Sequence, residues 1–157
     1  MAFGFLALVA TAGAAPPWQN ADQIRSELAA AQTELQFHDG AGEPVAMAAA
    51  ALRGPLRQGL AAEAPGELAE VEAALASAGL AARQRDDTGL AAARGGAIAA
   101  LRRGAMAVAI AAARSGKAAR AQAWLQIRDF RKAPRITRPR VDGTEEVQER
   151  AAAETAS

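Results

Sequence analysis

Apolar residues recur every three or four positions through most of this chain, the spacing at which side chains share one face of an α-helix. Helices are predicted from Asn20 to Asp39-Gly40, from Pro44 toward Leu60, from Pro65 to Gly79, from Asp86 or Asp87 to Ala113, around Trp124 until Pro134, and from Thr144 to Ala153. Strand-like alternation is nearly absent. The pattern therefore predicts an all-α fold, an antiparallel bundle of about five or six alanine-rich helices over residues 20–153, with a frayed tail at 154–157.

The same spacing predicts which residues face the core. The inward positions are Ile24, Leu28, Ala31, Leu35, Met47, Leu52, Leu56, Leu60, Leu68, Val71, Leu75, Leu90, Ala97, Leu101, Val108 and Ala112. Gly95, Gly96 and Gly104 each weaken their helix by roughly 1 kcal/mol relative to alanine. We expect them where a neighbouring helix approaches closely, with the helix of Trp124 as the candidate.

Helix ends are predicted from capping chemistry. Asn20 is expected to cap the first helix with Gln23 as its capping-box partner, after a linker at residues 15–19. Gly54-Pro55 should kink or split the second helix, because proline lacks the backbone N–H. Asp86-Asp87 reads as a helix N-cap beside a charged loop; a functional carboxylate pair is the alternative.

The first fifteen residues are apolar and end in small side chains, with an A-x-A pattern at Ala12-Gly13-Ala14. This is typical of a secretory signal peptide, and the run is shorter than the about 20 residues that a membrane span needs. We predict a signal peptide at residues 1–14 and an extracytoplasmic mature domain; a buried N-terminal helix is the alternative. No later segment is expected to cross a membrane, since the uncharged run 104–113 is short and is bracketed by arginines.

Composition narrows the possible chemistry. The net charge is +1 and cysteine is absent, which excludes disulfides, thiol catalysis and thiolate metal sites. One histidine and no tyrosine leave few groups for acid–base work, and no phosphate loop, zinc spacing or nucleophile elbow is present. We therefore expect neither an enzyme nor a cofactor. His38, Asp39 and Glu43 surround a turn and are weak candidates for a metal site, but Asp-Gly in a turn has a purely conformational explanation.

The stretch from Arg120 to Thr144 differs from the rest of the chain. Two large aromatics meet seven cations there: Trp124 and Phe130, with Arg120, Arg128, Arg131, Lys132, Arg135, Arg138 and Arg140. Ala121, Trp124, Leu125 and Arg128 share one helical face, and Pro134 should end that helix. Both aromatics are interpreted as core anchors. The cations around 120–140 form a basic strap that could bind lipid headgroups or nucleic acid, or remain a solvated and partly ion-paired face.

This stretch also resembles the segment before the membrane part of bacterial iron permeases of the FTR family. The matching residues are Trp124, Leu125, Arg128, Asp129, Phe130, Arg131, Thr137, Arg138, Pro139, Asp142 and Thr144. The resemblance is strongest from Asp86 to Thr144. Pro134-Arg135-Ile136 and Gly143 depart from the family pattern, in which Thr-Arg-Phe and Ala stand.

The resemblance implies an accessory or docking role in iron uptake, beside a membrane-embedded iron permease component. The family's transport motif R-E-x-x-E is absent from this sequence. The chain would therefore be a truncated, split or degenerate member and not itself the transporter, with iron as a transported or weakly bound ion. The alternative is a helical interaction protein whose basic strap, residues 120–140, binds an anionic surface; of the two surfaces, nucleic acid is the less expected partner.

Overall fold

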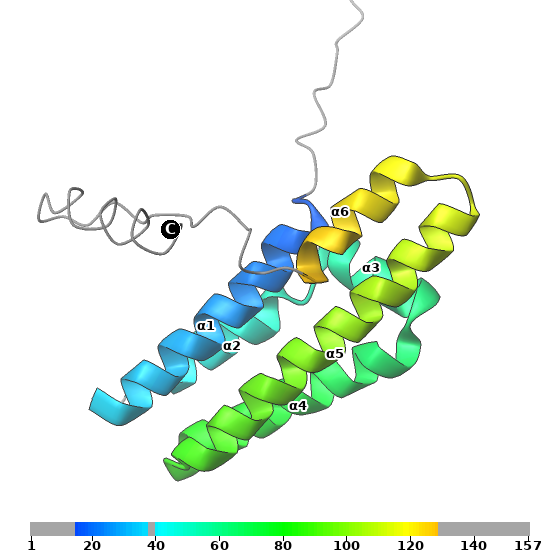
Figure 1. The fold of residues 1–157 in the computed structure, drawn as a ribbon. Coiled ribbons are helices and arrows are strands. Elements are labelled where there is room, and N and C mark those ends of the chain that lie inside the picture. Colours follow the sequence, from blue (N-terminus) through cyan, green and yellow to red (C-terminus); the bar gives the residue numbers. More distant parts are fainter. Residues whose placement is uncertain (1–14, 38–39, 129–157) are drawn as a thin grey trace, which may run out of the picture.

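The computed structural model describes residues 15–37 and 40–128, and every element within these ranges is an α-helix. The helices are α1 (Pro17–Phe37), α2 (Gly42–Ala51), α3 (Gly54–Glu63), α4 (Pro65–Gln84), α5 (Asp87–Arg114) and α6 (Ala118–Arg128). In Figure 1, α1 and α2 form one antiparallel pair and α4 and α5 another, while α6 folds back along α5 and across the first half of α1. The predicted all-α bundle is confirmed. The helix predicted at 144–153 lies outside the described residues.

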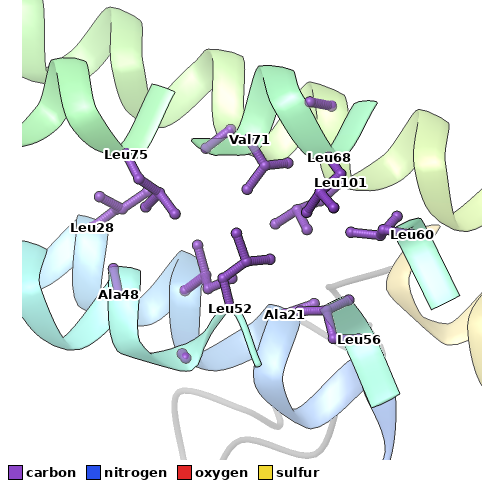
Figure 2. Packing of buried hydrophobic residues seen from close by; sticks show 14 of the residues in the cluster. Ala21, Leu28, Ala48, Leu52, Leu56, Leu60, Leu68, Val71, Leu75 and Leu101 are labelled. Atoms are coloured by element: carbon purple, nitrogen blue, oxygen red, sulfur yellow. The ribbon is translucent and has the colours of Figure 1, made fainter. Parts of the chain in front are cut away.

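All six helices contribute to one continuous core, which is mostly leucine and alanine, with Trp124 and Ile127 from α6. Leu28 of α1 and Leu75 of α4 point toward each other, and Leu60 and Leu101 bring α3 and α5 into the same cluster (Figure 2). The expected inward residues are buried, except that Leu35 is only partly buried and Met47 is 41% exposed. Met47 was wrongly predicted, because on the ten-residue α2 the buried stripe runs through Val45, Ala48 and Ala51 instead.

Gly54-Pro55 splits the predicted second helix into α2 and α3, as expected. Pro55 carries no N–H to bond the carbonyl of Ala51, four residues earlier. Asn20 Nδ2 donates to that Ala51 oxygen at 2.9 Å from α1, and the Arg53 N–H bonds it as well. Asn20 therefore satisfies the end of α2 and does not cap α1. The helix α1 begins at Pro17, three residues before the predicted start and inside the predicted linker 15–19.

The turn between α4 and α5 lies beyond its predicted place. α4 continues through Gly79 to Gln84, and Arg85, in the left-handed conformation at φ 56°, ends it. Gly79 faces α2, where Val45 Cγ1 would lie 3.9 Å from an added methyl group. The Asp86 carboxylate then accepts the Gly89 N–H at 2.9 Å, so the predicted N-cap at the start of α5 is confirmed.

One helix among the described residues is long and apolar enough to cross a membrane by length and composition alone. It is α5, whose best 18-residue window has a mean hydropathy of 1.4. The expectation that no segment after residue 15 crosses a membrane rested on the short uncharged run 104–113, and it stays a prediction. α5 meets the length and composition criterion all the same, because a mean over 18 residues tolerates one or two arginines. The same window is 44% buried inside the bundle, where α5 packs against α1, α3, α4 and α6.

Candidate functional site

The described part of the family-like stretch is helix α6. Ala121, Trp124 and Ile127 form its buried face, and Leu125 packs against the core from the edge. Trp124 is 2% exposed, which confirms its predicted role as a core anchor. Arg128, predicted to share the face of Trp124, is exposed in the last turn, where a cation complements the helix carbonyls.

Trp124 fits into a slot on α3 that exists because residue 59 has no side chain. A methyl group built on Gly59 would overlap Trp124 Cζ2 and would lie 2.7 Å from Cη2, which is closer than real contacts allow. The glycine that admits Trp124 is thus on α3. Gly104 instead lets Leu60 and Glu67 approach α5, and nothing lies within 4 Å of a methyl group on Gly95, so the predicted approach of the Trp124 helix to these glycines is wrong.

The remaining residues of the family-like motif lie outside the described residues. They are Asp129, Phe130, Arg131, Thr137, Arg138, Pro139, Asp142 and Thr144. The last described residue before them is Arg128, which ends α6 directly after the buried Ile127. Trp124 and Ile127 are the buried residues that hold α6 to the bundle, where α6 packs against α1 and α5 (Figure 1). The role of the motif residues stays a prediction.

Of the weak metal candidates, His38 and Asp39 also lie outside the described ranges. Glu43 is exposed in the first turn of α2. Within residues 15–37 and 40–128, no group of three histidine or carboxylate side chains is placed to hold a metal ion. A pocket of about 320 Å³ opens beside this turn, lined by Leu35, Gly42, Ala82, Arg83 and Arg85. The described side chains that line it are cationic or apolar and include no carboxylate or imidazole.

Two polar features were not found from the sequence. Glu27 is buried on α1, where Asn20 is the other buried polar residue, and it does not lack an interaction partner. Gln32 accepts from Arg94 at 3.0 Å, and Gln32 and Gln36 reach Asp87 at 3.5 Å, so a polar seam joins α1 to the start of α5. Gln32 and Gln36 lie on the polar side of the predicted first helix. The sequence does not show that this side faces the start of α5; the tertiary structure does.

A comparison with models of protein families finds a match over residues 14–157. The matching family is described as the iron permease FTR1 N-terminal domain. The match covers all six described helices and the stretch around Trp124 that carries the resemblance. No curated protein and no solved structure matches the chain.

Proposed function

Because the chain belongs to the iron permease FTR1 N-terminal domain family, we propose that it is an extracytoplasmic helical domain that docks beside a membrane-embedded iron permease component. It is an accessory of iron uptake and not itself the transporter. Its sequence carries no R-E-x-x-E motif. The proposal assigns the chain a scaffold role, in which helices position a docking segment.

The observation that carries this proposal is the seating of α6. Trp124 fills the Gly59 slot and Ile127 is fully buried, so the helix leading into the family motif is anchored to the bundle. A docking segment that leaves from a fixed point loses less conformational entropy on binding than one on a loose tether. In this proposal Arg128, Arg131, Arg135 and Arg138 are structural and hold the strap in place, with Arg128 acting on the last carbonyls of α6.

Co-expression with a membrane protein that carries R-E-x-x-E tests the docking role. We expect the two to co-purify and radiolabelled iron uptake to rise when the chain is present. Arg128→Glu combined with Arg131→Glu should abolish both effects, whereas the matched pair Arg53→Glu and Arg83→Glu should leave them intact. Uptake that is equal with and without the chain, with no co-purification, would refute the proposal.

Titration calorimetry with ferric iron separates a scaffold from a metal-sampling domain. We expect no site tighter than about micromolar, roughly −8 kcal/mol. Ferric ion prefers hard oxygen ligands, and the proposal gives the carboxylates only weak contacts with it. A nanomolar site would overturn the scaffold role and direct attention to His38, Asp39 and Glu43. The alternative of an anionic surface bound by the strap at 120–140 stays a prediction, since most of that range lies outside the described residues.

A further inference from the structure

Charge is distributed unevenly over the described helices. Residues 88–128 contain no aspartate or glutamate and seven cations: Arg94, Arg102, Arg103, Arg114, Lys117, Arg120 and Arg128. The described residues before Thr88 carry ten acidic side chains against five basic ones. The hairpin formed by α5 and α6 is therefore cationic, and it packs against helices whose net charge is negative.

Only some of these cations form hydrogen bonds or ion pairs between helices. Arg94 donates to Gln32, and Arg103 pairs with Glu70 of α4. Arg114, Lys117 and Arg120 are exposed and form no ion pair or hydrogen bond within the described residues. These three flank the α5–α6 turn, at the opposite end of α5 from the α4–α5 turn (Figure 1).

Backbone hydrogen bonds hold the α5–α6 turn in one conformation. Gly116 adopts a φ of 71°, the left-handed geometry that favours glycine. The Lys117 N–H then donates to the Ala112 carbonyl at 2.9 Å, and the Gly116 N–H donates to Ala113 at 3.0 Å. Arg114 and Lys117 are consequently held on either side of a closed turn, and Arg120 lies in the first turn of α6.

An apolar side chain accompanies the cations. Ile110 is 44% exposed and precedes Arg114 by four residues, so the two share a face of α5. Met106, a further turn back, is partly exposed. Exposed apolar groups bordered by arginine and lysine are the chemistry of surfaces that lie in the headgroup region of anionic bilayers.

We propose that the end of the α5–α6 hairpin, made of Ile110, Arg114, Lys117 and Arg120, binds the surface of an anionic lipid bilayer. Each cation near such a surface raises the partition coefficient about fivefold, which corresponds to about 1 kcal/mol. Nucleic acid fits this surface less well, because single-strand binding uses stacking aromatics and Trp124 is buried. The inference goes beyond docking to a permease and holds whether or not such a partner exists.

Co-sedimentation of the full chain with vesicles tests this. The chain should bind vesicles rich in phosphatidylglycerol and not vesicles of phosphatidylcholine alone, with binding that weakens as salt increases. Arg114→Gln combined with Lys117→Gln should lower binding about 25-fold, two factors of about five. Ile110→Asn should lower binding with no change in charge. Circular dichroism would check that these exposed-site variants remain folded.

Two control double variants test whether vesicle binding depends on the α5–α6 hairpin or on another basic region. Arg53→Gln with Arg83→Gln removes the same charge from the acidic side of the bundle, and binding should change little. Arg135→Gln with Arg138→Gln removes it from the strap. The proposal is overturned if the strap pair abolishes vesicle binding while the hairpin pair retains it. It is also overturned if the chain binds both kinds of vesicle equally, or binds RNA and neither vesicle. None of these results bears on co-purification with a permease, so the two proposals can fail separately.

Discussion

Two contacts in this bundle depend on a group that another residue lacks: the side chain that is absent at position 59 and the N–H that is absent from Pro55. Trp124 occupies space that any side chain at Gly59 would fill, and Asn20 donates the hydrogen bond that Pro55 cannot. Both relations join helices that are far apart in the sequence. The sequence indicated that Trp124 is buried, because it lies on an apolar stripe. The sequence could not indicate that Trp124 contacts Gly59, since a glycine within a helical sequence does not show which side chain packs against it.

Trp124→Ala should destabilise the fold by roughly 3–5 kcal/mol, the cost of removing a buried aromatic ring. Gly59→Ala should cost about 1–3 kcal/mol through overpacking against the same ring. Denaturant unfolding of both variants measures these losses. Gly66→Ala is the control, because nothing lies within 4 Å of a methyl group there. A Trp124→Ala variant that melts within a degree or two of the parent would contradict the anchoring role.

Asn20→Ala should destabilise the protein by about 0.5–1.5 kcal/mol, because the Ala51 carbonyl loses one of its two donors and keeps the Arg53 N–H. Asn20→Asp should cost more, since a carboxylate has nearly the same shape and cannot donate when ionised. Thermal melts at neutral pH rank the two variants. Equal stability of Asn20→Asp and the parent would show that the 2.9 Å bond contributes nothing.

The helix boundaries show which structural features can be predicted from residues close together in the sequence. The Asp86 cap and the break at Gly54-Pro55 were predicted, because each acts within one turn of the backbone. Gly79 was taken as a helix end, yet α4 passes through it where α2 comes close. Asn20 carries the usual N-cap side chain, yet its partner is on another helix. A tertiary contact decided the case of Asn20, and a local sequence pattern does not contain such contacts.

Gly95→Ala should stabilise α5 by roughly 1 kcal/mol, since its position in the helix is exposed and has no neighbour within 4 Å. Gly104→Ala should lose this gain or reverse it. A methyl group there would lie 3.2 Å from Glu67 Cβ and would displace Leu60. Chemical denaturation of the two variants in parallel gives the comparison. Equal gains in stability from both would contradict the close packing of α3 and α4 on Gly104.

At the scale of the whole molecule, the fold class followed from periodicity and the family from the stretch around Trp124. The candidate site followed only in part, because eight motif residues lie outside the described residues and His38 and Asp39 do as well. The cationic hairpin was missed, since a net charge of +1 conceals a chain whose helices divide by sign. Overall charge sums over a surface, whereas recognition depends on how that charge is arranged.

Export of the chain is a prediction at the same scale. We expect residues 1–14 to be removed in a bacterial host and the mature domain to accumulate outside the cytoplasm. Intact-mass measurement of protein from separated cell fractions checks this. The matched control replaces Leu6 and Leu8 by arginine, which should block export. Recovery of the full-length parent from the cytoplasm would contradict both the signal peptide and the extracytoplasmic location.

The Trp124 slot has a consequence for local opening. α6 is an 11-residue helix whose own hydrogen bonds do not make it stable alone, so it persists through its buried face. Detachment of α6 exposes Ala121, Trp124 and Ile127 while α1–α5 retain most of their core. Such partial unfolding costs less than global unfolding, and amide hydrogen exchange in α6 should be faster than in α5. Any partner that pulls on the segment after Arg128 acts first on α6, so tension should release α6 before it unfolds α1–α5.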